Sequence, residues 1–275
     1  MSPKDEIQIL LTNDDGIHSP GLWAAAEALS SLGFVTVVAP RDQQSGIGRG
    51  FPSTSDGIIQ EREVEVGGNT WSVYAIGGSP AQAVQHGILE IMPRKPDLIV
   101  AGINFGENVG SGVTISGTVG AALEGASNEV RSMAVSLQTD IRLHGEISFE
   151  VDFSAAAYFT ALFARLLLKS ESMPDVDALK VEIPSDATPS TPWRVTRISK
   201  EKYFIPIPPE RTNLEEPWVL GYRQATHIEK FKPGTDAHAI QVERKVSVTP
   251  LSLDLTSRVD LTAFEEMLRG INSGS

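Results

Sequence analysis

Two patterns of hydrophobic and polar positions alternate along the first part of the chain. Short, mostly apolar runs, such as 8–12 and 34–39, are typical of strands buried on both faces of a parallel sheet. Between them, after a Ser-Pro pair that suits a helix start, apolar residues recur at the spacing of one helix face: Leu22, Ala25, Ala26 and Leu29. Residues 7–39 are therefore predicted to form a β-α-β unit.

The same alternation continues to residue 183. It predicts further strands at 98–101, 133–137 and 179–183, a hairpin with strands at 58–66 and 71–76 joined through Gly67-Gly-Asn69, and helices over 80–92, from about 116, and over 153–168. Strands that alternate with helices in this way predict an α/β fold with a mainly parallel sheet.

From Pro184 to Pro233 the pattern changes, because prolines become frequent and short extended segments alternate with turns. Segments at 193–199 and 218–223 predict an antiparallel appendage, followed by a helical turn at 235–240, a strand at 246–250 and a terminal helix over 257–271. We expect one continuous domain in two parts, a core over residues 1–183 and an extended C-terminal arm, strand and helix over 184–275.

Composition narrows the function classes. The chain has 275 residues, of which 41% are hydrophobic, and no apolar run approaches the roughly 20 residues of a membrane span. Its polar N-terminus lacks the apolar core of a signal peptide, so a cytoplasmic location is expected. The net charge of −12 argues against binding to a nucleic-acid duplex. Because there is no cysteine, any metal site must use oxygen or nitrogen ligands.

The first strand ends in Asn13-Asp14-Asp15-Gly16, where two adjacent carboxylates repel each other unless a positive charge lies between them. A divalent cation such as Mg2+ or Mn2+ would neutralise them, and glycine would allow the tight backbone turn that brings them together. The alternative is a plain turn, since Asn, Asp and Gly dominate turns for backbone reasons.

Three loops should leave the same edge of the sheet, at 13–18, 41–50 and 102–118, where ligands of open α/β folds bind. With the two aspartates, Ser45 and the amide of Asn104 or Asn108 could complete an oxygen site for one cation. Each of these residues could equally stabilise a turn.

Ser116-Gly117-Thr118 opens a predicted helix, where N–H groups and hydroxyls could bind phosphate or simply cap the helix. Neither the complete dinucleotide fingerprint nor the GxxxxGK[ST] phosphate loop is present.

Five separated motifs, in order, resemble the SurE family of stationary-phase survival nucleotidases: ILLTNDDGIHSPG, APRDQQSG, AGINFGENVG, SGTVGAALEG and VSVTPLSLDLT. The resemblance covers most of residues 7–138 and resumes at 178–256. It implies a Rossmann-like three-layer core and metal-dependent hydrolysis of nucleoside 5′- and 3′-monophosphates, with short polyphosphates as substrates of some members. It also implies a homodimer or homotetramer formed by exchange of the C-terminal arm.

By this resemblance one divalent cation, Mg2+ or Mn2+, would be held in each subunit by Asp14, Asp15, Ser45 and Asn104. Phosphate or substrate would lie near Asn13, Gly16, Asn108, Ser116, Gly117 and Thr118. Two positions depart from the family pattern: Ile115 stands where tyrosine is frequent, and Gly78-Ser-Pro-Ala-Gln-Ala-Val84 lacks the Asp and Cys of its motif. Both departures bear on substrate preference.

A mechanism follows as a hypothesis, in which the cation polarises phosphate and activates a water that attacks phosphorus in line. Asp15 is the better candidate to orient that water, and Asp14 is mainly a ligand. His18 and His238 are candidates for substrate contact, whereas His86, His144 and His227 are assigned to the surface or to packing. The alternatives are a haloacid-dehalogenase-like phosphatase, which needs its second Asp two residues later, and a nucleotide-binding regulatory module without catalysis.

Overall fold

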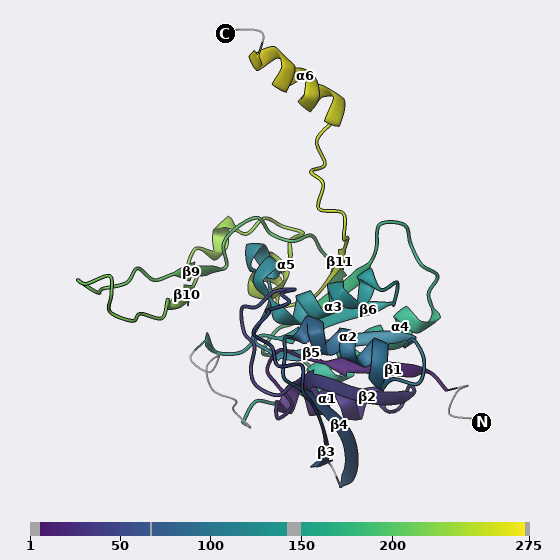
Figure 1. The fold of residues 1–275 in the computed structure, drawn as a ribbon. Coiled ribbons are helices and arrows are strands. Elements are labelled where there is room, and N and C mark those ends of the chain that lie inside the picture. Colours follow the sequence, from purple (N-terminus) through teal and green to yellow (C-terminus); the bar gives the residue numbers. More distant parts are fainter. Residues whose placement is uncertain (1–5, 67, 142–149, 273–275) are drawn as a thin grey trace.

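The computed structural model describes residues 6–66, 68–141 and 150–272, and its centre is a nine-stranded sheet (Figure 1). The strand order is β3-β4-β2-β1-β5-β6-β7-β11-β8. The strands are β1 (Gln8–Thr12), β2 (Phe34–Pro40), β3 (Ile59–Val66), β4 (Asn69–Ile76), β5 (Leu98–Phe105), β6 (Ser132–Leu137), β7 (Ala178–Ile183), β8 (Trp193–Val195) and β11 (Val246–Leu251).

The middle of the sheet is parallel, as the apolar runs predict. Strands β4, β2, β1, β5, β6 and β7 pair in parallel, whereas β3 and β4 form the predicted antiparallel hairpin. Residue 67 of the predicted hairpin turn lies outside the described residues. β11 runs antiparallel to β7 and parallel to β8, so two strands from beyond residue 183 extend the same sheet as the core.

Helices cover both faces of the sheet. They are α1 (Pro20–Leu29), α2 (Pro80–His86), α3 (Gly117–Ser127) and α4 (Ser154–Lys169), and a π-helical turn extends α2 to Ile91. Successive residues of β1 face opposite layers: Ile9 and Leu11 pack toward α1 and α4, and Leu10 packs toward α2 and α3. Two hydrophobic layers therefore sandwich the sheet, and the predicted α/β three-layer core is confirmed.

The C-terminal part extends away from this body (Figure 1). β9 (Phe204–Pro206) and β10 (Tyr222–Gln224) pair antiparallel in a projecting arm, and α5 (Asp236–His238) follows it. The last helix, α6 (Leu261–Asn272), stands off the sheet with the side chains of Leu261, Phe264, Met267 and Leu268 exposed.

Several predicted bounds were wrong, for physical reasons. β5 does not end at Ala101 but continues to Phe105 through an irregularity at Gly102, where a Cβ would lie 2.3 Å from the Val135 carbonyl oxygen. Asn104 therefore lies on a strand rather than in a loop. The extended segment predicted at 218–223 forms a strand only over 222–224, and the terminal helix begins at Leu261 instead of Ser257.

Candidate active site

The turn after β1 is built by the side chain of Asn13. Its amide nitrogen donates to the carbonyl of Gly16 (3.0 Å), and its amide oxygen accepts from the N–H of Gly16 (3.2 Å). Gly16 has a φ of 92°, a left-handed conformation that glycine adopts without strain. Asn13 and Gly16 thus shape the loop that presents the two aspartates, and both polar atoms of the Asn13 side chain are engaged in the turn.

Asp15 lies at the contact between β1 and β5. Its carboxylate accepts a hydrogen bond from the backbone N–H of Phe105 (2.9 Å) and one from the side chain of Gln43 (3.4 Å). Burial, together with the nearby charge of Asp14, raises the pKa of Asp15 to about 7. A backbone N–H and a side-chain amide, both neutral donors, therefore hold the Asp15 carboxyl group in place.

Asp14 faces the start of α3. The hydroxyl of Thr118 donates to its carboxylate, and the backbone N–H groups of Gly117 and Thr118 also favour its charged form. Burial nevertheless raises the pKa of Asp14 above its usual range. A side chain at position 117 would collide with this arrangement, since a Cβ there would lie 2.7 Å from the Asp14 Cβ.

Among the described residues, the two carboxylates have no cationic partner. Each aspartate is only 5% exposed. Within residues 6–66, 68–141 and 150–272, no lysine, arginine or histidine forms an ion pair with either of them. Two buried carboxylates without a counter-charge among the described residues provide hard oxygen donors of the kind that divalent cations prefer. The residues therefore fit a divalent cation.

The three predicted loops converge here. The N–H of Gln44, next to Ser45, donates to the Asp14 carbonyl (2.7 Å), which brings the 41–50 loop against the Asp14–Asp15 turn while Ser45 stays exposed. The same loop meets the third one where the N–H of Gly48 donates to the carbonyl of Ile115 (2.9 Å).

The remaining predicted residues of the third loop occupy distinct positions. Asn104 is half-buried at the end of β5, and its amide nitrogen donates to the Gly106 carbonyl (2.6 Å), which leaves its oxygen as the candidate ligand atom. The Asn108 side chain donates to the hydroxyl of Ser136 (3.1 Å). Ser116 accepts from the N–H of Val119 (3.1 Å) and so caps α3, the structural alternative for this serine.

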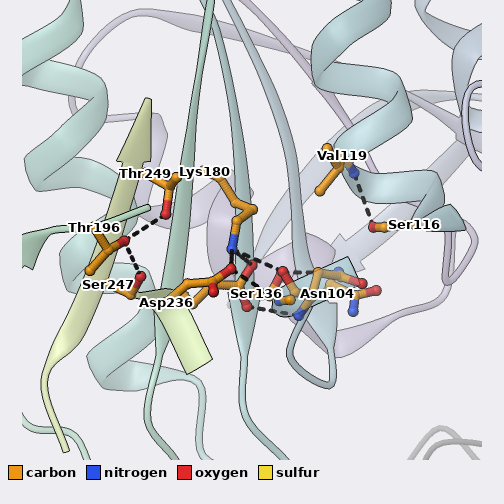
Figure 2. A network of polar contacts seen from close by, with 12 residues as sticks. Asn104, Ser116, Val119, Ser136, Lys180, Thr196, Asp236, Ser247 and Thr249 are labelled. Carbon is orange, nitrogen blue, oxygen red and sulfur yellow. Dashed lines mark hydrogen bonds and ion pairs between the residues drawn. The ribbon is translucent and has the colours of Figure 1, made fainter. Parts of the chain in front are cut away.

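A buried charged cluster beside the site was not predicted (Figure 2). The Lys180 ammonium lies 3.4 Å from Glu182 and 3.1 Å from Asp236, and all three side chains are fully buried. Burial disfavours the charged ammonium, but the two carboxylates outweigh it and raise the pKa of Lys180. A signal exists in the sequence: two charged residues alternate within the otherwise apolar strand Ala178–Ile183.

Neither histidine candidate forms an ion pair with the two aspartates in the part of the chain that the structure describes. His18 is exposed next to the turn. His238 lies at the end of α5, where its ring is 3.5 Å from Glu243; among the described residues it forms no ion pair with a predicted metal ligand. His144 lies outside the described residues, His86 pairs with Glu90, and His227 pairs with Glu229 at 3.2 Å.

Comparison with known proteins decides the family. The family model described as "Survival protein SurE" matches residues 9–204, which include both aspartates and all three loops. This chain belongs to the SurE family. Proteins named 5′-nucleotidase SurE are 41% identical in Thermococcus kodakarensis, over 95% of this chain and 97% of that protein, and 42% identical in Thermococcus gammatolerans, over 96% and 97%.

A solved SurE-family structure has the same fold. The crystal structure of SurE protein from Aquifex aeolicus matches with a TM-score of 0.74 and 31% identity, over 95% of this chain and 99% of that chain. The match includes the part beyond residue 183, so the SurE family is shown over nearly the whole chain. The predicted division at residue 183 into core and appendage stays a prediction.

Proposed function

We propose that this chain is a phosphatase that hydrolyses nucleoside 5′-monophosphates, and also 3′-monophosphates, to nucleoside and phosphate with one divalent cation, Mg2+ or Mn2+, per subunit. The observation that carries the proposal is the buried Asp14–Asp15 pair, two adjacent carboxyl groups with no cationic partner among the described residues. The relatives named 5′-nucleotidase support the substrate class.

Each candidate side chain has a distinct role in the proposed reaction. Asp14, Asp15, Ser45 and Asn104 would hold the cation, which would supply a Lewis acid at the phosphate and an activated water. Asp15 would orient the attacking water and accept its proton. Asp14 is kept in place by the Thr118 hydroxyl. The start of α3, at Ser116–Thr118, and Asn108 would contribute to binding the phosphate, with the positive end of the helix favouring its charge.

The purified chain should release phosphate from nucleoside 5′-monophosphates when Mg2+ or Mn2+ is present, and lose this activity with a chelator. A panel of 5′- and 3′-monophosphates, short polyphosphate and a non-nucleotide phosphomonoester would define the preference. Binding of nucleotides without metal-dependent release would contradict the proposal and favour a regulatory binding module instead.

We also propose a dimer or tetramer in which C-terminal segments are exchanged. Support comes from α6, which stands off the body with its apolar side chains exposed. Deletion of residues 257–275 should lower the mass measured by light scattering. No helix in the described ranges is long and apolar enough to cross a membrane. The cytoplasmic location stays a prediction, which cell fractionation would test.

A further inference from the structure

The side chains of Lys180, Glu182 and Asp236, here called the triad, form hydrogen bonds with the backbone of the loop that leads into α3. Glu182 accepts a hydrogen bond from the N–H of Asn108 (2.8 Å), and Lys180 donates to the carbonyl of the same residue (2.9 Å). Asp236 accepts from the N–H of Gly110 (3.1 Å). Each member of the triad therefore bonds to the backbone of residues 108–110, only a few residues before the helix start that faces Asp14.

A row of polar residues also connects the triad with the candidate ligand Asn104. Across the sheet, Asn104 of β5 pairs with Ser136 of β6, and Ser136 pairs with Glu182 of β7. The Ser136 hydroxyl accepts a hydrogen bond from the Asn108 side chain (3.1 Å), which connects this row to the loop at residues 108–110. Figure 2 shows Lys180 pointing toward Asp236 beside Ser136 and Asn104.

Asp236 brings the C-terminal part of the chain into this cluster. Its second carboxylate oxygen accepts from the N–H groups of Ser199 and Ala237, both at 2.8 Å. The same side chain thus holds the segment that enters the arm, the start of α5 and the loop of the site. Since the triad carries two carboxylates and one ammonium, these backbone N–H groups stabilise its surplus negative charge.

We propose that the Lys180–Glu182–Asp236 triad is a positioning device for the active site. It fixes the backbone of residues 108–110, and with it the start of α3 and the end of β5. It also makes the geometry of the site depend on the C-terminal segment that carries Asp236. None of the three residues touches the substrate. The effect of the triad on kcat can be measured only if the proposed nucleotidase function is correct. Its effect on the backbone of residues 108–110 can be measured without that function.

The experiment compares three isosteric variants. Asp236→Asn places an amide where Gly110 and Lys180 both donate, and Glu182→Gln does the same toward Asn108. Thr249→Val is the matched control, because it removes a buried hydroxyl of β11 that is 2.7 Å from Thr196 and does not bond to the loop. Amide hydrogen exchange, kcat and KM are measured for each folded variant with Mg2+ or Mn2+ present.

Each of the two triad variants should weaken the hydrogen bond of one backbone amide in the loop. In Asp236→Asn the N–H of Gly110 should exchange at least about tenfold faster, and in Glu182→Gln the N–H of Asn108 should do so, while sheet amides such as Val181 keep their protection. We expect kcat to fall roughly 10- to 100-fold in both, as for groups that orient metal ligands, with a smaller change in KM. Thr249→Val should keep wild-type kcat and loop exchange.

The proposal is overturned if folded Asp236→Asn and Glu182→Gln match Thr249→Val in kcat and in exchange at positions 108 and 110. If neither variant folds, the wild-type protein still decides: the amides of Gly110 and Ser199 share one carboxylate, so they should open together, and unrelated opening free energies would contradict the proposal. Absence of phosphate release by the wild-type chain would instead refute the proposed function and leave the exchange result interpretable.

Discussion

Two groups of buried carboxylates lie at the same edge of the sheet and are stabilised in opposite ways. Glu182 and Asp236 share the ammonium of Lys180 and receive several backbone N–H groups. Asp14 and Asp15 receive a hydroxyl and N–H groups, but no cationic side chain among the described residues. The first group contains its own counter-charge, whereas the second has none among the described residues and would be balanced by a proton or by a bound cation. This difference distinguishes a structural cluster from a candidate binding site, although both groups consist of buried carboxylates.

The largest expected effect comes from Asp15→Asn, which removes the proton acceptor from the uncompensated pair. Metal-dependent phosphate release should fall about 10²- to 10⁴-fold, the usual contribution of a general base. The variant should fold at least as stably as the wild type without metal, because one of two repelling charges is gone. Near-normal activity in a folded variant would refute the role given to Asp15.

Lys180→Met should destabilise the Lys180–Glu182–Asp236 triad by removing its only positive charge. It leaves Glu182 and Asp236 buried without their ammonium, so the free energy of unfolding should fall by about 3–5 kcal/mol. Urea denaturation of this variant beside Asp15→Asn tests the comparison directly, since a charge is removed in both cases. If both variants lose the same stability, the two groups do not differ as described.

Metal and pH should act on the uncompensated pair together. In the metal-free protein the pKa of Asp15 is about 7, against 3.8 for an unperturbed aspartate, so the folded state binds more protons than the unfolded chain between these values. Stability should therefore decrease as pH rises through this window. Added Mg2+ or Mn2+ should offset the loss, by about 2.7 kcal/mol at 100 times Kd. Tm measured with metal and with chelator should diverge as pH rises, and Asp15→Asn should show a smaller divergence.

The smallest expected effect comes from loss of the hydrogen bond that the Thr118 hydroxyl donates to Asp14. Thr118→Val removes the hydroxyl that donates to the Asp14 carboxylate, so the metal concentration for half-maximal activity should rise about tenfold, equivalent to about 1.4 kcal/mol. Thr160→Val is a fitting control, since its hydroxyl donates to the Ala156 carbonyl within α4 (2.7 Å), away from the site. Equal metal dependence of the two variants would show that the hydroxyl does not support Asp14.

Much of the fold and the outline of the site could be predicted from the sequence. Strands buried on both faces leave apolar runs, and successive strand ends of a parallel sheet meet at one edge, so the convergence of the 13–18, 41–50 and 102–118 loops followed from element order alone. The turn of Asn13 and Gly16 likewise follows from local chemistry.

Features that depend on contacts distant in sequence could not be predicted. Lys180 and Glu182 resemble the outward positions of an ordinary strand until β11 and α5 cover them. Tyr203 lies in a proline-rich stretch that predicts an exposed arm, yet its side chain is buried and its hydroxyl donates to Glu107 (2.5 Å). The antiparallel arm was predicted, but its strand at 204–206 was missed, because a strand of three residues carries too few positions to show a period.

The close approach of α3 has a consequence for how the site tolerates sequence change. At Gly120 a Cβ would lie 2.4 Å from the Gly48 carbonyl oxygen, just as one at Gly117 would meet Asp14. These two positions have no side chain with which to bind anything, and in a library of random variants they should nevertheless rank among the least replaceable. The absence of a side chain at these positions lets α3 approach the Asp14–Asp15 turn and the 41–50 loop closely.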